Sequence, residues 1–442
     1  MDNQSLIYLI CSITFVATTL AHNNTWESDS YWQLRAQGAR KRNMEAYNHN
    51  PFNVTNHINH HARMIFEDVM GLNSTRRKMM LSKKHIGLCT FYNPIDACWR
   101  CRPNWAQNRK RLAKCALGFG KGTIGGMVGR GYVVTDPSDD DLVNPKPGTL
   151  RHAVIQPEPL WIIFSKPMTI RLSQELIMTS HKTIDGRGAN HVVIEGGAGI
   201  TIQYVENIII HGIKIRNIVP GSGGLIRDSI DHFGLRTESD GDAISIFGSH
   251  HIWIDHVSFS RCADGLIDVV EGSTAITISN CHMTDHDKVF LFGASNDQSD
   301  DRKMQVTVAY THFGRGLVQR MPRCRYGFFH LVNNDYTHWV MYAIGGSQNP
   351  TIISQGNRFL PPPDPRVKEV THREQPESAW DSGTWKSYQD YLLDGATFTE
   401  SGNSIWYHPQ EDQLINPIVH GRFAPQLTQF SGPLKCITNL PC

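Results

Sequence analysis

Residues 243–260 read AISIFGSHHIWIDHVSFS and contain two short runs of β-branched and aromatic residues around a Gly-Ser turn. Runs of the same kind recur from LWIIF at 160–164 to PTIISQGNRF at 350–359, bounded by Gly, Asn or Asp. Such runs predict short β-strands joined by turns. Because no stretch with helical periodicity lies between them, a βαβ fold is disfavoured.

The runs repeat along the chain. Ile254, Ile278, Val308, Leu331 and Ile353 occupy similar places in successive runs, at spacings of 24, 30, 23 and 22 residues. A repeat of this length without helices predicts a solenoid whose stacked coils bury Ile and Val. The sequence therefore predicts an all-β protein, a parallel β-helix. A β-sandwich is the alternative, but the Asn-Gly and Asp-Gly turns typical of its hairpins are few.

Asparagines follow or end several runs. Asn tolerates turn geometry, and its amide can form a ladder between coils. We expect these roles for Asn207, Asn217, Asn280 and Asn334.

Composition divides the chain into four regions. Residues 1–21 predict a signal peptide, because the apolar stretch 6–17 is shorter than the about 20 residues of a membrane span and small residues follow it. Residues 22–88 form a polar N-terminal extension with one or two short helices. Residues 89–360 form the β-helix with its N-terminal cap, and 361–442 form loops and a short helix packed on its side. No second long apolar run follows, so we expect a soluble secreted protein without membrane contact.

The sequence contains ten cysteines, one of them in the predicted signal peptide. Secretion favours disulfides, and the nine that remain leave at least one thiol over. We favour bridges from Cys98 to Cys115 and from Cys436 to Cys442. The CWRC stretch at 98–101 is a poor redox or zinc motif, since no second C-x-x-C accompanies it.

The N-terminal extension carries no recognisable chemistry. Its histidines indicate a solvated helix face rather than a metal site: His57, His60 and His61. Three sequons predict glycans, at Asn23, Asn53 and Asn73.

The formal charge is +2, and the chain has no basic tract or basic helix. This balance gives no sign of a nucleic-acid partner. We expect a monomer.

Acidic residues recur with the same period as the strands. Asp240 and Asp264 are 24 residues apart, and Asp242 and Asp268 are 26 apart. Within a coil, Asp240 and Asp242 are two residues apart, and Asp264 and Asp268 are four apart. Each of these two pairs can therefore share a strand face. Four clustered carboxylates repel unless a cation lies between them, and oxygen ligands of this kind suit Ca²⁺. Two solvated turns are the alternative.

Basic residues continue this column. Lys288 lies 24 residues after Asp264, and QRMPRCR at 319–325 adds Arg320, Arg323 and Arg325. The proline removes a backbone donor, so this stretch is not the middle of a sheet. Taken alone, it would be a solvated loop. Beside a cation site, it indicates an acidic polymer whose carboxylates bridge the metal and the Lys or Arg side chains.

At these residues the sequence resembles the plant pectate lyases of polysaccharide lyase family 1, which belong to the parallel β-helix superfamily and are related to certain pollen allergens. The resemblance extends from residue 93 to the C-terminus. The matching stretches include NPIDACWRCRPNWAQNRKRLAKCALGFGKGTIGG at 93–126, SDGDAISIFGSHHIWIDH at 239–256, DGLIDVVEGSTAITISN at 264–280, HDKVFLFG at 286–293 and QRMPRCRYGFFHLVNNDYTHW at 319–339.

The resemblance implies a right-handed β-helix, secreted to the plant cell wall, that cleaves de-esterified homogalacturonan by Ca²⁺-dependent β-elimination. It assigns calcium binding to Asp240, Asp242, Asp264 and Asp268, substrate-carboxylate binding to Lys288 and Arg325, and the catalytic base to Arg320. Arg323 receives no role beyond a structural contact. An arginine base is unusual, but neighbouring cations favour the neutral guanidine, and we expect an alkaline optimum.

The stretch TDHDKVFLFGASN at 284–296 departs from the family pattern, in which HH often precedes DKV and GHSD follows it. The departures, which bear on substrate preference, are Asp285, Ala294, Ser295 and Asn296. Two other functions stay open. A β-helix polygalacturonase would use paired carboxylates and water, leaving the Lys and Arg residues idle. A non-catalytic or weakly active pectin-binding wall protein would not need Arg320.

Overall fold

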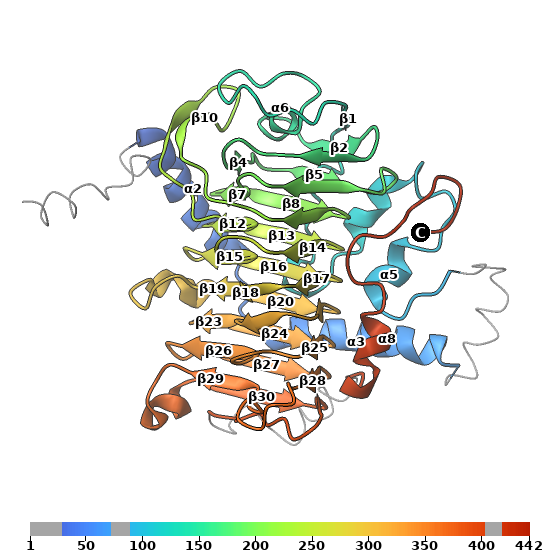
Figure 1. Ribbon diagram of the computed structural model, residues 1–442, viewed down its shortest axis with the longest axis vertical. Helices are drawn as coiled ribbons and strands as arrows, with labels where there is room; N and C mark the ends of the chain where they lie inside the picture. The colour runs from blue at the N-terminus through green and yellow to red at the C-terminus, as the bar shows by residue number, and fades with distance from the viewer. Residues whose placement is uncertain (1–28, 72–88, 403–417) are drawn as a thin grey trace, which may run out of the picture.

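The computed structural model describes residues 29–71, 89–402 and 418–442, and a stack of parallel coils forms its body (Figure 1). Three strands per coil build three sheets that run the length of the stack. The ten-stranded sheet comprises, in spatial order, β1 (Arg130–Val134), β2 (Leu160–Phe164), β5 (Lys182–Asp185), β8 (Glu206–His211), β13 (His250–Asp255), β16 (Thr274–Ser279), β20 (Gln305–Ala309), β24 (Phe328–Val332), β27 (Thr351–Gln355) and β30 (Thr384–Tyr388).

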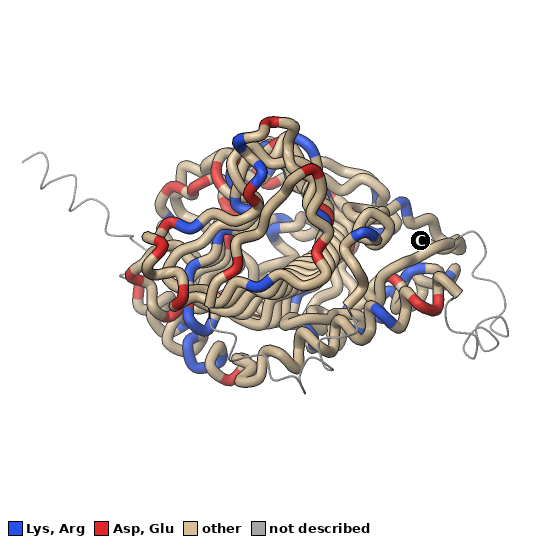
Figure 2. The backbone as a smooth tube through the Cα atoms, turned by 90° about the horizontal axis from the view of Figure 1, so that it is seen from below, with Lys and Arg blue, Asp and Glu red and all other residues tan. Residues whose placement is uncertain are grey.

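The other two large sheets complete each coil. The nine-stranded sheet comprises β3 (Met168–Ile170), β6 (Val192–Glu195), β9 (Lys214–Arg216), β14 (Ser258–Ser260), β17 (His282–Thr284), β21 (His312–Phe313), β25 (Asp335–Thr337), β28 (Arg358–Leu360) and β31 (Tyr391–Leu392). The eight-stranded sheet comprises β4 (Leu176–Ile177), β7 (Ile200–Gln203), β12 (Ile244–Phe247), β15 (Ile267–Val270), β19 (Phe290–Phe292), β23 (Arg323–Arg325), β26 (Ile344–Ser347) and β29 (Thr371–Arg373). Strand pairing within all three is parallel, and the view along the axis shows the coils superimposed (Figure 2).

Two small ribbons lie outside these sheets. β10 (Gly224–Arg227) and β11 (Phe233–Arg236) form an antiparallel hairpin, and β18 (His286–Lys288) pairs in parallel with β22 (Leu317–Gln319). The predicted parallel β-helix is confirmed.

Most of the predicted repeat is the true register of the stack. Ile254 lies opposite Ile278, Ile278 opposite Val308, and Val308 opposite Leu331, and all four are fully buried in the core. The last step is wrong by one residue, because Leu331 lies opposite Ser354. Ile353 instead faces outward, where it packs with Phe119 and Phe328. A shift of one residue moves a side chain to the other face of a strand.

Asn217, Asn280 and Asn334 follow strands, as predicted, whereas Asn207 lies near the start of β8. Asn207, Asn217 and Asn280 have φ values of 62°, 51° and 49°. Asn334 forms the ladder instead: its Oδ1 accepts from Thr311 N of the preceding coil, and its backbone N donates to Asn357 Oδ1 of the next coil. Each coil thereby satisfies polar groups of its neighbours.

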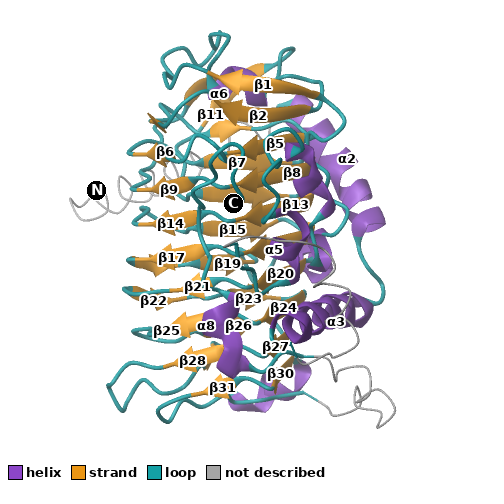
Figure 3. Cartoon of the chain, turned by 90° about the vertical axis from the view of Figure 1, so that its right-hand side faces the viewer, coloured by secondary structure: helices purple, strands orange, loops and turns teal. Residues whose placement is uncertain are grey.

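Two long helices lie along the outside of the stack, α2 (Ser30–Ala46) and α3 (Pro51–Val69) (Figure 3). They are longer than the one or two short helices predicted. Trp32 of α2 packs with Ile177 and Tyr204 of the β-helix. The α3 helix begins with an Asn50 cap followed by Pro51, a favourable start for a helix. The predicted signal peptide lies outside the described residues.

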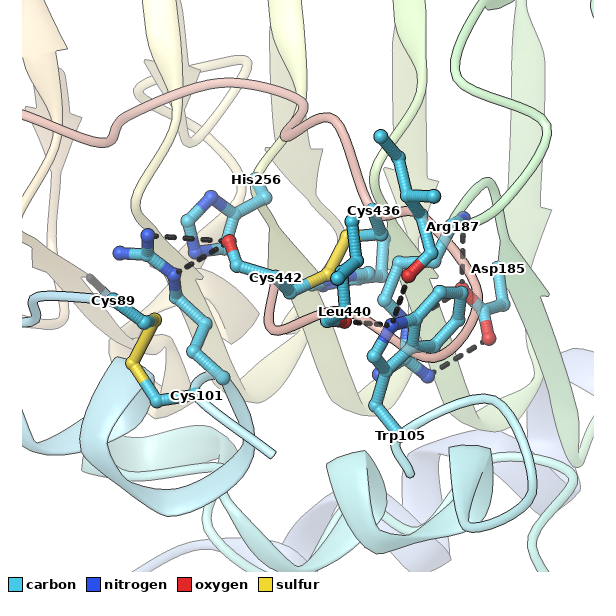
Figure 4. Close-up of a disulfide and its surroundings, with 12 residues drawn as sticks. Cys89, Cys101, Trp105, Asp185, Arg187, His256, Cys436, Leu440 and Cys442 are labelled. Carbon is cyan, nitrogen blue, oxygen red and sulfur yellow. Dashed lines mark hydrogen bonds and ion pairs between the residues drawn. A yellow bond between two sulfur atoms is a disulfide. The ribbon is translucent and has the colours of Figure 1, made fainter. Parts of the chain in front are cut away.

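The cap and the C-terminal segment fasten to each other over one side of the stack. The cap contains α5 (Pro94–Trp99), η1 (Arg109–Lys114) and η2 (Gly118–Gly120), and the C-terminal segment contains η6 (Gly421–Phe423) and α8 (Ala424–Leu427). Trp105 Nε1 donates to the carbonyls of Ile437 and Leu440, at 3.2 and 3.1 Å (Figure 4). Three shorter elements are α6 (Leu150–Val154), η3 (Ser299–Lys303) and η4 (Glu377–Ser382).

The predicted disulfides Cys98–Cys115 and Cys436–Cys442 are confirmed, and a third joins Cys89 to Cys101. The two cysteines of CWRC therefore have different partners, which excludes a redox pair. The described free cysteines, all in the β-helix, are Cys262, Cys281 and Cys324.

A buried histidine joins the cap, the C-terminal segment and the stack. His256 lies 2.8 Å from Asp96 Oδ1 through Nε2 and 2.9 Å from the Gly432 carbonyl through Nδ1. Since both partners are acceptors, both ring nitrogens carry protons and His256 is an imidazolium. Burial alone would lower its pKa, but the charges of Asp255 and Asp96 and its hydrogen bonds raise it.

We expect His256→Gln to lower the free energy of unfolding by about 3 kcal/mol near pH 6, because it leaves Asp96 buried and partly unpaired. A raised folded pKa contributes stability that is present below the unfolded value of 6.5 and is lost as the pH rises through the folded pKa. The difference between the two proteins should therefore shrink toward about pH 9. Denaturant titration at both pH values measures it.

The exposed His49 provides the matched control, His49→Gln, which should leave stability unchanged at both pH values. A His256→Gln deficit that is constant between the two pH values would contradict a charged His256.

Candidate active site

The four predicted aspartates gather at the start of two neighbouring strands of the eight-stranded sheet. Asp240 and Asp242 precede β12, Asp264 precedes β15, and Asp268 lies on β15 opposite Ser245. The prediction that each pair shares a strand face is wrong, because only Asp268 lies on a strand. The other three lie in loops, and Gly241, with a φ of 92°, turns the chain between Asp240 and Asp242.

Two of the carboxylates converge on one glycine. Gly265 N donates to Asp242 Oδ1 at 2.7 Å. A Cβ atom on Gly265 would lie 2.1 Å from Asp268 Oδ1 and 3.1 Å from Asp242 Oδ1. The absence of a side chain at residue 265 is therefore what lets both carboxylates approach this point. Ser245 Oγ donates to the second oxygen of Asp242 at 2.9 Å and orients it.

These carboxylates are poorly solvated and repel each other. Burial raises the pKa of Asp242 to about 6. Burial and the charges of Asp242 and Asp264 raise the pKa of Asp268 well above its usual range. Asp268 Oδ1 is buried and has no hydrogen-bond partner among the described residues. The charged forms therefore require a cation nearby.

Asp264 is turned toward Lys288. Lys288 Nζ lies 2.7 Å from Asp264 Oδ1, and both side chains are more than a third exposed. In the described ranges, no three His, Cys, Asp or Glu side chains converge closely enough to hold a metal ion. The cluster thus consists of the convergent pair Asp242 and Asp268, with Asp240 and the lysine-paired Asp264 beside it.

The three predicted arginines lie together on the coil of β23, two coils after β15, and have different surroundings. Arg323 and Arg325 are buried on β23, which pairs with β19 and β26 inside the eight-stranded sheet. The prediction that this stretch is not the middle of a sheet is therefore wrong for the residues after Pro322, and the alternative of a solvated loop is excluded for them. Arg323 forms an ion pair with Glu374. Arg325 donates through NH1 to the Gly293 carbonyl at 2.6 Å. Burial and the charges of Arg323 and Arg320 lower the pKa of Arg325.

Arg320 lies between β22 and β23, beside Lys288. Lys288 lies opposite Gln319, and Phe290 N donates to the Arg320 carbonyl at 2.7 Å. The positive charge of Arg320 acts to lower the pKa of Asp268, against the larger effects that raise it. Its Nε is buried without a hydrogen-bond partner, and no carboxylate in the described residues forms an ion pair with its guanidinium.

Sequence reasoning missed the residues that hold these side chains in place. Asn296 Oδ1 accepts from Arg325 Nε at 3.1 Å and from Ser347 Oγ at 3.3 Å. The sequence placed Asn296 among the departures from the family pattern without revealing this contact. Glu374, the partner of Arg323, lies 51 residues away, and no local pattern connects the two.

A cavity of about 190 Å³ adjoins Asp240 and Asp242. It widens the site toward β7 and the loop after β11. Side chains of both charge signs line it, including Glu175, Arg236 and Glu238. Thr201 Oγ1 donates to Glu175 at 2.6 Å, and Arg236 also bonds to Glu175.

Family models described as "Pectate lyase" and "Pectate lyase, N terminus" match residues 171–411 and 24–79. A pectate lyase of Lilium longiflorum is 57% identical over 98% of this chain and 99% of its own length. The chain belongs to the pectate lyase family. "Probable pectate lyase P59" of Solanum lycopersicum is 54% identical over 99% of this chain and 98% of its own length.

Two solved structures have the same fold as this pectate lyase. The cedar pollen allergen Jun a 1 is 45% identical, with a TM-score of 0.74 over 78% of this chain and all of the allergen chain. A thermostable pectate lyase, PL 47, shares the fold at 21% identity, with a TM-score of 0.54 over 73% of this chain and 97% of its own. The family and fold predicted from the sequence are confirmed.

Gly265→Ala should lower pectate cleavage by at least about tenfold, because the new methyl group would displace the carboxylates of Asp242 and Asp268. The Gly38→Ala variant is the matched control, since the nearest atom to its Cβ is the movable end of Arg42. Initial rates on polygalacturonate, with thermal unfolding of each variant, measure the effect. Equal rates for Gly265→Ala and the parent protein would show that the converging carboxylates are dispensable.

Proposed function

We propose that this pectate lyase cleaves de-esterified homogalacturonan by Ca²⁺-dependent β-elimination at the cluster of Asp, Lys and Arg side chains. Elimination removes the C5 proton, α to the uronate carboxylate, and expels the glycosidic oxygen at C4. The groups that cleave must therefore bind the carboxylate, stabilise the charge that develops there and accept a proton. The arrangement of Asp268, Lys288 and Arg320 on adjacent coils is the observation that carries this proposal.

The acidic residues fit a hard divalent cation. Asp240, Asp242, Asp264 and Asp268 offer only oxygen ligands, which Ca²⁺ prefers. The buried, unpartnered Asp268 Oδ1 and its converging neighbour Asp242 are the strongest support for this fit. Asp264 would join them by leaving Lys288. Bound calcium would withdraw charge from the substrate carboxylate and thereby acidify the C5 proton.

Lys288 and Arg325 are proposed to bind the substrate carboxylate. Lys288 is a half-exposed point charge that can move from Asp264 to a uronate. Arg325 is oriented by Asn296 and by the Gly293 carbonyl, neither of which neutralises its charge. Together they would stabilise the enolate-like charge that forms when the proton leaves.

Arg320 is proposed as the base. It differs from Arg323 and Arg325 because neither a carboxylate nor a backbone carbonyl of the described residues holds its guanidinium. To accept the C5 proton the guanidine must be neutral, a form that alkaline pH favours for any arginine. We therefore expect activity to rise from neutral to alkaline pH.

The site of action proposed for this pectate lyase is the plant cell wall, reached by secretion as a monomer. No helix among the described residues is long and apolar enough to cross a membrane. Asn53, one of the predicted glycan acceptors, is exposed on α3. The sequons at Asn23 and Asn73 lie outside the described residues.

A non-catalytic wall protein that binds pectin is the second candidate, because a major pollen allergen shares 45% of the sequence and the fold. The intact group of Lys288, Arg320 and Arg325 favours the lyase, since binding alone does not require an arginine at residue 320.

The decisive experiment follows the ultraviolet absorbance of polygalacturonate incubated with the purified protein, with calcium or with a chelator. A rise in absorbance that requires calcium would establish elimination. Chain cleavage without absorbance, indifferent to chelator, would indicate a hydrolase. Absence of cleavage at neutral and alkaline pH would indicate a binding protein.

Arg320→Ala should lower the elimination rate by about 10²–10⁴-fold, the usual contribution of a positioned base. Arg315→Ala is the matched control, because Arg315 lies five residues upstream with its side chain 86% exposed. An Arg320→Ala variant with more than about a tenth of the parent rate would remove Arg320 from the role of base.

Asp268→Asn should weaken calcium binding by at least about tenfold, because it removes one charge from the buried pair. Calorimetric titration of calcium into the substrate-free protein measures this independently of activity. The exposed Asp297 provides the control variant, Asp297→Asn. Unchanged calcium affinity in Asp268→Asn would contradict the assigned ligand set.

A further inference from the structure

A second charged groove lies on another side of the stack. It has a volume of about 810 Å³ and runs between the cap residues 102–114 and the first two strands of the ten-stranded sheet, β1 and β2. The aspartate cluster, in contrast, lies at the eight-stranded sheet and involves β12, β15 and their loops. The two sites therefore use different sheets and share no residue.

The groove is lined by five basic side chains and by no acidic one, so the prediction that the chain has no basic tract is wrong for residues 102–114. Arg109 is neutralised by Asp185 at 3.0 Å. The other four form no ion pair with a carboxylate in the described residues: Arg102, Lys110, Arg111 and Lys114. The Lys110 ammonium donates to the Gly129 carbonyl, and Arg111 Nε donates to the Cys98 carbonyl at 2.9 Å. Neither contact cancels a charge.

The cations cannot easily move apart, because the segment that carries them is fixed. The disulfide Cys98–Cys115 closes it, Arg109 ties it to Asp185, and Trp105 anchors it to the C-terminal segment. Burial and the neighbouring charge of Arg102 lower the pKa of Arg111. A polyanion in the groove would relieve the repulsion between these cations.

The remaining lining suits a sugar polymer. Asn104, Gln107 and Asn108 offer amide oxygens to hydroxyl groups, while Met127 and Ile163 contribute apolar surface to the floor and Trp161 of the same strand as Ile163 is buried. Cations for carboxylates, amides for hydroxyls and an apolar floor for ring faces together match an acidic polysaccharide.

We propose that this groove is a second binding site for polyuronate, which holds a segment of the substrate polymer away from the site of cleavage. The proposal rests on the polyuronate substrate of the proposed function. A chain held at both sites would be retained near the catalytic cluster between cleavage events, since the second contact raises its effective concentration.

The test compares the Arg102→Glu/Lys114→Glu double variant with the parent protein. Both side chains are exposed, and neither forms an ion pair with a carboxylate of the described residues. Lys166→Glu/Arg171→Glu is the control, because it makes the same charge change at two exposed residues outside both sites.

Retention on immobilised polygalacturonate is measured first, as a function of salt, with a chelator present to remove calcium-mediated binding. We expect the groove variant to elute at lower salt, with its affinity reduced by about threefold or more, as for the loss of two exposed ion pairs. This readout needs no catalysis, so it stands even if the protein does not perform elimination. Equal elution of the groove variant, the control and the parent would overturn the proposal.

Activity then separates the groove from the catalytic cluster. We expect KM for long polygalacturonate to rise about threefold or more in the groove variant, with kcat/KM for trigalacturonate unchanged. Equal losses on polymer and trimer would place the effect at the catalytic cluster and overturn the second site. A third outcome would also overturn the second site: the groove variant loses retention equally on dextran sulfate and on polygalacturonate, and its KM for the polymer is unchanged. The groove would then be a general polyanion surface.

Discussion

The hydrogen-bonded register between successive coils is the constraint on which the rest of the structure depends. Once Ile254, Ile278, Val308 and Leu331 stack inside the coil, every loop between strands has a fixed height along the axis. Residues far apart in the sequence then meet at distances set by the coil rise, as Asp264 and Lys288 do across 24 residues. Asparagines at the turns satisfy polar groups of the scaffold. The charged side chains in the loops are therefore not needed to stabilise the fold.

The charged groups of the proposed cleavage site are balanced across coils. Asp242 and Asp268 are held close by the space that Gly265 leaves, which costs electrostatic free energy. Lys288 and the arginines of the following coils lie where they partly offset that cost. Arg323 and Arg325 are fixed by Glu374, Asn296 and the Gly293 carbonyl. A rigid array of this kind is preorganised for a polymer in which every sugar ring carries a carboxylate.

The sequence predicted the coil and the chemical types at the site, and structure was needed for the contacts. Periodic Ile and Val residues report burial directly, which is why the period was correct until the one-residue shift at Ile353. The face-sharing argument failed for Asp240 and Asp264 because loop backbones do not follow the period of a strand. Asn296 and Glu374 could not be found from local patterns, since they reach Arg325 and Arg323 across whole coils. The imidazolium of His256 likewise depends on partners 160 and 176 residues away.

The fastening of the cap by the C-terminal segment also sets an order of events during synthesis. Trp105 is made early, but the carbonyl of Leu440 that accepts its indole proton follows 335 residues later. The coils can stack one after another as the chain is produced, whereas the cap stays without its final partners until that segment follows. The last step of folding in this protein is therefore the docking of the C-terminal segment onto the cap of a β-helix that is already assembled.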